Sequence, residues 1–328
     1  MMTIPKQEGT PEPSILLGGQ AVLEGVMMRG PSRIATAVRR ADGTIAVHAE
    51  TFTPIGQRVK ALSLPLLRGA VGMIEMLVVG IRALNFSADV AMGAVSGNGS
   101  AGTRKPGNAA LAGTVIVALL FGLLLFFVTP LLVTTFLFDV GRDPLLFNVT
   151  AGIIRMVLFL VYLAAIAQLQ DIQRLFAYHG AEHKSVFAYE QGCTLSVEEV
   201  ATRSRFHPRC GTSFLLIVML SAIILFAVTD TIILAWTGSI TVVVRLAVHL
   251  PLVPFVAGLS YEVIRLSARH AAARWARWLS LPGLLLQRIT TREPDAQQLE
   301  VALTALRASL SADWQETQAT SHAVAMEA

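Results

Sequence analysis

Charged side chains and cysteines are scarce in this sequence of 328 residues. Charged residues make up 15% of the chain, whereas a soluble domain carries roughly 25%. Apolar residues make up 54% and the mean hydropathy is +0.60, which excludes a disordered chain and argues against a wholly soluble one. The two cysteines, Cys193 and Cys210, are too few for a disulfide framework.

Several motifs of soluble enzymes are also missing. The sequence has no P-loop, no nucleophile elbow and no Rossmann fingerprint, so nucleotide hydrolysis and serine chemistry have no support. The 26 Lys and Arg against 22 Asp and Glu give a formal net charge of +4, an ordinary excess for the loops of a membrane protein. We therefore expect membrane lipid as a partner and no nucleic acid, while homo-oligomerisation stays open and the substrate is unknown.

Long apolar runs predict a mainly α, polytopic membrane protein with four transmembrane helices, because about 20 apolar residues cross the hydrocarbon core. The runs are 109–138, 145–169, 212–229 and a fourth within 232–261. We expect the third run to end at Asp230. Transmembrane helices 1 and 2 thus occupy 109–169, and helices 3 and 4 occupy 212–266.

The positions of Lys and Arg predict the orientation of these spans. Five basic residues lie between spans two and three, and four follow span four: Arg174, Lys184, Arg203, Arg205, Arg209, and Arg265, Arg269, Arg274, Arg277. The other two loops carry almost none. We expect a multi-pass protein of the cell inner (cytoplasmic) membrane, with both termini and the central loop in the cytoplasm. Arg245 then lies near the outer interface, where its side chain can snorkel.

A fifth apolar stretch, within 63–95, has a different pattern. Its charges Arg68, Glu75 and Arg82 recur every seven residues and share one face of a helix. An apolar helix with one charged stripe favours the membrane interface, so we predict an interfacial or re-entrant helix, with a fifth span as the alternative.

The remaining segments are predicted to lie outside the membrane. Residues 14–62 predict a small β module with strands over 20–28, 34–40 and 44–52, in which Asp42-Gly43 is a hairpin turn signal. Residues 267–310 predict a cytoplasmic amphipathic region whose terminal helix carries leucines on one face: Leu299, Leu303, Leu306 and Leu310. We expect a disordered leader over 1–13 without a cleaved signal peptide, a flexible linker over 96–108 and a disordered tail over 311–328.

The segment 170–211 concentrates the residues that can bind a metal. Its first half contains Tyr178-His-Gly-Ala-Glu-His-Lys, and if a helix continues there, His179 and His183 lie one turn apart on one face. Two neutral imidazoles at this spacing can bind Zn²⁺ or a similar cation. Glu182, beside the second histidine, is the candidate catalytic base, since His-x-x-Glu-His is also the inverted zinc-peptidase pattern.

A second half-site closes the same segment. His207 and Cys210 lie three residues apart just before span three, and spans two and three meet the same membrane face. We therefore predict that His179, His183, His207 and Cys210 converge on one divalent metal, with zinc as the leading candidate. Four filled positions indicate a structural site, and three plus water indicate catalysis; only catalysis needs Glu182 or Glu190. The alternative is that these histidines cap carbonyls and the cysteine packs.

Other polar residues are accessory candidates. In the glycine-flanked run Gly18–Pro31, alternation places Gln20 and Glu24 on one side of a strand, where they can approach a site or simply be solvated. Glu262, at the cytoplasmic end of span four, is either a further ligand or an interface carboxylate.

Five motifs in order resemble the bacterial YqhQ-like membrane protein family, domain of unknown function 1385. They are GGQAVLEGVMMRGP with Arg29, YHGAEHKSVFAYE with Glu190, HPRCGTSF with Arg209, SYEVIR with Glu262, and PGLLLQRITTREPD. The resemblance covers about residues 15 to 310. The family carries the label "predicted metal-dependent enzyme", so the resemblance implies a metal-dependent enzyme and names no reaction.

Two functions stay open at this stage. The first is a cytoplasm-facing metal-dependent hydrolase. The second is a transporter or membrane scaffold with a structural metal site, because Arg155, Arg245 and His249 lie within spans and intramembrane polar groups commonly mark a transport route.

Overall fold

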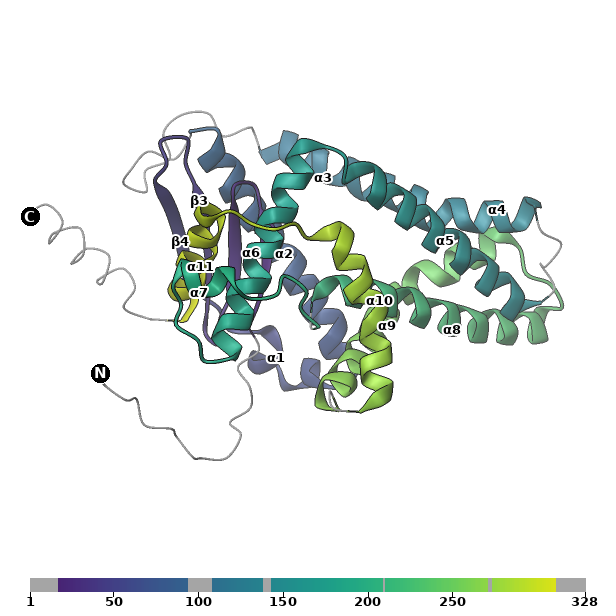
Figure 1. Ribbon diagram of the computed structural model, residues 1–328. Coiled ribbons are helices and arrows are strands. Elements are labelled where there is room, and N and C mark those ends of the chain that lie inside the picture. The colour runs from purple at the N-terminus through teal and green to yellow at the C-terminus, as the bar shows by residue number, and fades with distance from the viewer. Residues whose placement is uncertain (1–16, 94–107, 138–142, 209, 271–272, 311–328) are drawn as a thin grey trace, which may run out of the picture.

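The computed structural model describes residues 17–93, 108–137, 143–208, 210–270 and 273–310. A lobe that contains the only sheet of these residues adjoins a bundle of long helices (Figure 1). The prediction of a mainly α protein with a small N-terminal β module is confirmed. Three short elements complete the lobe: α1 (Ile55–Arg58), η1 (Lys60–Ser63) and α7 (Val197–Ala201).

The sheet is antiparallel and its strands follow chain order. They are β1 (Gly18–Val22), β2 (Gly25–Arg29), β3 (Arg33–Arg39) and β4 (Ile45–Thr51). The single strand expected over 20–28 is wrong, because the chain reverses at Leu23 and Glu24 and Glu24 adopts a φ of +52°. The turn at Asp42-Gly43 is confirmed, with a φ of +86° at Gly43, a conformation that glycine adopts without steric cost.

Both faces of the sheet are covered by helices. Val26 and Met28 of β2 pack with α6 (Gln170–Glu190) and α11 (Ala296–Leu310) in one core. Met27 points to the opposite face, where Val79 of α2 (Leu67–Ala91) belongs to a second core. Consecutive apolar residues in β2 are therefore expected, because successive side chains of a strand point to opposite faces and both faces are dry.

The predicted leucine face of the terminal helix is confirmed. Leu299, Leu303 and Leu306 of α11 are buried against the sheet and α6. The helix begins with a reciprocal cap: Gln298 N–H donates to the Asp295 carboxylate, and Asp295 N–H donates to the Gln298 side-chain oxygen. This cap fixes the start of α11 directly after the segment that reaches α6.

Four stretches of the bundle are long and apolar enough to cross a membrane. They are Gly113–Leu137, Pro144–Ile166, Phe214–Thr237 and Val242–Ser267. The first combines α3 (Asn108–Leu123), one π-helical turn η2 (Leu124–Val128) and α4 (Thr129–Leu137); the others lie in α5 (Pro144–Ile166), α8 (Gly211–Thr237) and α9 (Val242–Arg269). These helices support a multi-pass membrane protein.

The third span does not end where the sequence suggested. Helix α8 continues through Asp230 to Thr237, and α9 then begins at Val242. Asp230 lies inside the bundle with none of its surface exposed, because polar groups of α5 and α9 surround it. Pro251 and Pro254 lie inside one uninterrupted helix α9, so they do not break it.

Helices also occupy segments that were predicted only loosely. The stretch predicted as interfacial forms α2, which is not among the four candidate spans, and its membrane location stays a prediction. The segment 170–211, treated as a loop, begins with the 21-residue helix α6. Helix α10 (Arg274–Thr290) links α9 to the lobe. The predicted leader 1–13, almost all of the linker 96–108 and the tail 311–328 lie outside the described residues.

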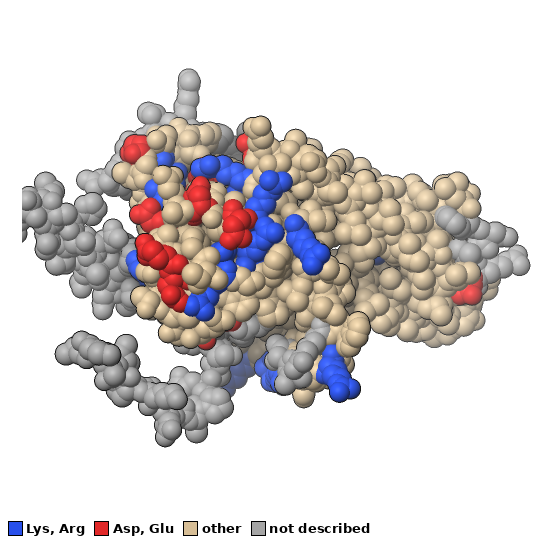
Figure 2. Space-filling view, viewed as in Figure 1, with Lys and Arg blue, Asp and Glu red and all other residues tan. Residues whose placement is uncertain are grey.

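Charge is distributed unevenly between the lobe and the bundle. Figure 2 shows Lys, Arg, Asp and Glu gathered over the lobe, whereas the visible bundle surface is almost entirely without them. This arrangement is typical of a bundle in lipid with a lobe in water.

Cysteine labelling tests the predicted orientation. A Ser239→Cys variant places a thiol in the exposed connection between α8 and α9, and an Ala41→Cys variant places one at the exposed β3–β4 turn. With Cys193 and Cys210 replaced by serine, a membrane-impermeant maleimide should label position 239 in intact cells, and position 41 only after lysis. The reverse result would contradict a cytoplasmic lobe.

Candidate metal centre

Two histidines of α6 lie side by side with fixed ring orientations. The ring centroids of His179 and His183 are 4.4 Å apart. His179 Nδ1 lies 2.8 Å from the Thr290 carbonyl oxygen, and His183 Nδ1 lies 2.5 Å from that of Arg205. A carbonyl only accepts hydrogen bonds, so each Nδ1 carries the proton and each neutral ring keeps its Nε2 lone pair available.

Cys210 completes a cluster of three ligand atoms. One ligand atom each from His179, His183 and Cys210 lies within 4.8 Å of the others. Cys210 Sγ is 3.3 Å from His179 Nε2. Cys210 directly precedes α8, so its sulfur lies at the N-terminus of that helix.

The surroundings of the three residues are those expected for metal ligands. Metal-binding histidines characteristically donate their second ring N–H to a carbonyl or carboxylate, which both rings do here. His183 Nε2 is buried, and among the described residues no well-formed hydrogen bond satisfies it, although the Cys210 thiol lies close enough to act on the ring. A buried ring nitrogen in this position is costly unless something binds it. Ligand atoms of a tetrahedral zinc ion lie about 3.5 Å apart, so this cluster needs only a slight contraction.

Burial keeps the imidazole of His183 neutral. Its side chain is buried, and desolvation is the largest cause that lowers its pKa, with the nearby His179 acting in the same direction and Cys210 in the opposite one. A neutral ring is the form that binds a metal.

Glu182 lies next to His183 on α6, and a backbone group of strand β1 holds its carboxylate. Its carboxylate accepts a hydrogen bond from the Gly19 backbone of β1, and it is 6% exposed. Burial raises the pKa of this carboxyl, while the nearby His179 and the Gly19 bond lower it. A Cβ at position 19 would lie 2.9 Å from the Glu182 carboxylate, so only glycine allows this approach.

A small cavity adjoins the cluster. Its volume is about 80 Å³, and Glu182, His183 and Cys210 line it together with Gly18 and Gly19. One water needs roughly 10–15 Å³ on the same measure, so water and a small reacting group fit.

His207 lines the same cavity as His183 and Cys210, although it is not one of the three grouped ligands. Its ring centroid is 5.8 Å from that of His183, and its Nε2 is 3.2 Å from the Glu190 carboxylate. Gln287 of α10 clamps the backbone at this point, with its amide oxygen accepting from His207 N–H and its amide nitrogen donating to the His207 carbonyl, both at 2.8 Å. A role for His207 as a fourth ligand stays a prediction.

A glycine explains how the 290–294 segment approaches α6. A Cβ at Gly180 would lie 2.1 Å from the Arg292 carbonyl oxygen. In the same contact Arg292 N–H donates to the Phe176 carbonyl. The glycine between the ligand histidines therefore allows the segment carrying Thr290 to lie close enough to orient His179.

Most accessory candidates are engaged elsewhere. Glu24 pairs with Arg174 and lies 3.3 Å from the Tyr178 hydroxyl, and Glu262 pairs with Arg68 of α2. Arg29 stacks on Phe52 with its guanidinium carbon 4.8 Å from the ring centroid. Gln20 packs against α2, where a Cβ at Gly80 would lie 2.5 Å from its side-chain oxygen. Arg209 lies outside the described residues.

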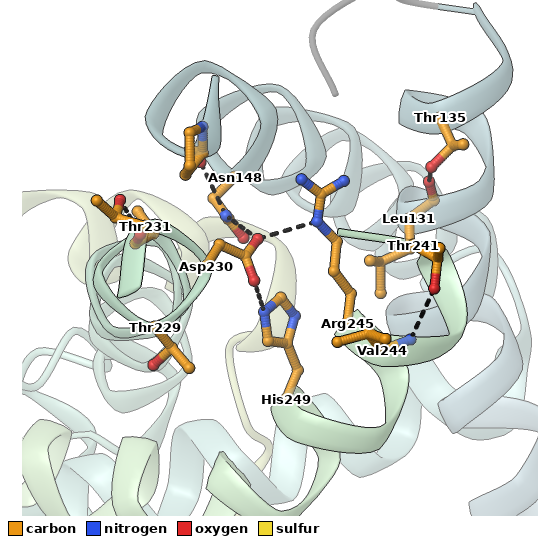
Figure 3. A network of polar contacts seen from close by, with 12 residues as sticks. Leu131, Thr135, Asn148, Thr229, Asp230, Thr231, Thr241, Val244, Arg245 and His249 are labelled. Atoms are coloured by element: carbon orange, nitrogen blue, oxygen red, sulfur yellow. Dashed lines mark hydrogen bonds and ion pairs between the residues drawn. The ribbon is translucent and has the colours of Figure 1, made fainter. Parts of the chain in front are cut away.

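A second polar cluster lies inside the bundle, around one carboxylate (Figure 3). Asp230 of α8 accepts from Asn148 Nδ2 of α5 at 2.8 Å, from Arg245 Nε at 3.0 Å and from His249 Nε2 at 2.8 Å, the last two on α9. The Arg245 guanidinium lies over Phe147, 3.3 Å from the ring centroid, and His249 stacks on Phe226 at 4.0 Å. The negative charge of Asp230 is thus balanced within the protein.

This cluster corrects the interpretation of the intramembrane arginines. Arg245 does not snorkel, because it is 2% exposed and bound to Asp230. Arg155 lies in the middle of α5, where its Nε donates to the Phe126 carbonyl of the π-helical turn at 2.8 Å. A π turn leaves carbonyls without their usual helical partners, so the side chain satisfies one of them.

Sequence reasoning missed several residues that position these sites. The carbonyls of Thr290 and Arg205 act through the backbone, which no residue type reveals. Gln287 is the single amide of the amphipathic helix α10, and Asn148 is the single amide of the apolar helix α5; only this isolation could have marked them. Asp230 was noted only as the end of a span.

Known proteins place this chain in a family without assigning it a reaction. A family model described as a protein of unknown function (DUF1385) matches residues 64–312. The chain belongs to the DUF1385 family. The uncharacterized protein YqhQ of Bacillus subtilis (strain 168) is 33% identical over 295 residues, which cover 87% of this chain and 89% of that protein. No solved structure matches.

The DUF1385 match contains all three clustered ligands and Glu182, whereas Gly19 of β1 precedes it. Neither description names a metal or a reaction. The case for metal binding in this DUF1385 protein therefore rests on the donor set and its surroundings.

Metal analysis tests the cluster directly. Wild-type protein purified without chelators should contain close to one divalent ion per chain, and His183→Ala should lose most of it, because one of three ligands is gone. His48→Ala, which removes an exposed histidine of β4, is the matched control and should keep the metal. Elemental analysis by mass spectrometry measures all three. A wild type that stays metal-free after incubation with Zn²⁺ would contradict the site.

Proposed function

We propose that this protein is a metal-dependent hydrolase on the cytoplasmic face of the inner membrane. One observation carries the proposal: His179, His183 and Cys210 form a cluster of three ligand atoms, and a small cavity beside it is lined by His183, Cys210 and the buried carboxylate of Glu182. Three protein ligands with room for water are typical of catalytic zinc sites, whereas structural sites fill all four positions.

The three ligand residues would hold the ion through His179 Nε2, His183 Nε2 and Cys210 Sγ. When bound, a divalent metal supplies Lewis-acid polarisation and increases the acidity of water. The chain provides the remaining chemistry. Thr290 and Arg205 orient the rings, and the burial of Glu182 and His183 strengthens the polar contacts that these two side chains make.

Glu182 is the residue that moves a proton. Its carboxylate takes a proton from the attacking water as the water oxygen bonds to the electrophilic carbon or phosphorus of the substrate. It then gives that proton to the leaving oxygen or nitrogen as the old bond breaks. The hydrogen bond from Gly19 fixes the carboxylate against β1, so it faces the cavity throughout.

His207 and Glu190 support this arrangement from one side. Glu190 is the last residue of α6, and its contact with His207 ties the end of this helix to the residues just before α8. Gln287 holds the His207 backbone, so α10 also positions this wall.

Glu182→Gln separates catalysis from metal binding. The variant should keep its metal and lose about 10²–10⁴-fold in hydrolysis, because the amide cannot accept the proton. Activity is measured with detergent-solubilised protein on a panel of ester, amide and phosphoester reporters. Glu198→Gln on the exposed face of α7 is the control and should retain activity. Hydrolysis that survives both Glu182→Gln and His183→Ala arises elsewhere.

Transport is the second candidate, supported by the buried Asp230 cluster. Ionisable groups inside a bundle commonly mark a transport route. Two features weigh against it. Both Asp230 oxygens are engaged by protein donors, and α9 is continuous through its prolines, so its backbone is not opened to a solute.

Asp230→Asn distinguishes a structural cluster from a transport site. If the cluster is structural, the variant should melt at lower temperature in detergent, since leaving Arg245 buried without its partner costs about 3–5 kcal/mol. Protein that remains folded should hydrolyse reporters like the wild type. Unchanged melting together with abolished solute flux in proteoliposomes would favour transport instead.

A further inference from the structure

Helix α2 has a second face that no described residue covers. Its buried residues Val79, Ala83 and Val90 face the sheet, while apolar residues on the other side are 40–54% exposed: Leu67, Ile74, Leu77, Val78 and Leu84. At about 100° per residue these five lie within an arc of about 120°, nearly opposite the buried face. Such a face is costly in water.

Helix α10 repeats this arrangement with tryptophans. Trp275, Trp278, Leu281 and Leu285 are 45%, 72%, 43% and 58% exposed, and at about 100° per residue they also share an arc of about 120°. The exposed Arg274 and Arg288 lie near the two ends of the same helix. Tryptophan and arginine side by side are typical of the lipid headgroup layer.

Both helices lie where the lobe meets the bundle. Gly69 of α2 packs on Gly258 and Tyr261 near the lobe end of α9, and α10 packs against α8. Tyr261 and Leu266 of α9 are exposed at this level as well. Helices α2 and α10 therefore adjoin α9 and α8, respectively, which contain two of the candidate membrane spans.

The metal centre lies at the same height. Cys210 precedes the first residue of its membrane span, Phe214, by four positions, roughly 6 Å along a helix. His179 is bound to Thr290, five residues after Leu285 on α10. The headgroup layer on each side of a bilayer is about 5–8 Å thick.

We propose that the bilayer surface on the lobe side lies along the exposed faces of α2 and α10, which places the metal centre at headgroup level. The part of this proposal that concerns substrate rests on the hydrolase function: the centre takes a membrane-borne amphiphile, whose polar group reaches it from the bilayer. A freely dissolved substrate gains nothing from this placement.

Tryptophan quenching tests the membrane surface. Full-length protein with Trp278 as the only tryptophan, after replacement of Trp236, Trp275 and Trp314 by phenylalanine, is reconstituted in vesicles of brominated phosphatidylcholine. Its emission should fall as far as that of a variant retaining only Trp236, which is 87% exposed at the far end of α8. A tryptophan-free protein carrying Ala41→Trp at the β3–β4 turn should lose no emission.

The height of the metal centre is measured by energy transfer. Co²⁺ bound at the cluster accepts energy from a fluorophore on a phospholipid headgroup over short distances, whereas Zn²⁺ has a filled d shell and does not. Donor emission should fall in vesicles with Co²⁺-loaded wild type, and should not fall with Zn²⁺-loaded wild type or with Co²⁺ added to His183→Ala.

Each outcome has one meaning. Unquenched Trp278 overturns the membrane surface, and if Trp278→Cys then forms disulfide-linked pairs, the face belongs to a second copy of the chain. Quenched Trp278 without energy transfer from a Co²⁺-loaded protein overturns the headgroup-level centre. A protein that binds no metal refutes the hydrolase proposal, whereas the membrane surface is still decided by Trp278.

Discussion

Two hydrogen bonds to backbone carbonyls hold the centre of this molecule in place. The carbonyls of Thr290 and Arg205 fix the Nδ1 protons of His179 and His183, so both Nε2 lone pairs turn toward Cys210. The carbonyls come from segments far apart in the chain, at the end of α10 and before α8. The lobe, helix α10 and the bundle must therefore all be in position before the three ligands can face one another.

The bundle contains its own constraint, and it follows the same rule for buried polar groups. A carboxylate in an apolar bundle is tolerated only when donors surround it, and Asp230 receives one from α5 and two from α9. The charge of Arg245 offsets that of Asp230, and aromatic rings cover the arginine and His249. These contacts fix the rotation of α8 against its neighbours, and Cys210 lies directly before the first residue of α8.

Several features were predictable because they depend on local periodicity or composition. Four apolar stretches, the Asp42-Gly43 turn, the leucine face of α11 and the one-turn spacing of His179 and His183 all follow from residues close in sequence. Two predictions were wrong, one because of an ion pair with another helix and one because of an unrecognised turn. A charged Asp230 predicted the end of a helix, but its ion pair with Arg245 allows it to lie inside the bundle. The strand predicted over 20–28 is instead two antiparallel strands, because the chain reverses at Glu24.

The sequence by itself determined that this is a membrane protein with a sheet-bearing lobe and a concentration of metal-binding residue types in one segment, because apolar run length and helical spacing are local properties. Only the tertiary structure decided which of those residues meet. His179, His183 and Cys210 converge, while His207 turns to Glu190 and Glu262 to Arg68. The direction in which a side chain points depends on which distant group it bonds to, and the residue types alone do not predict such pairings.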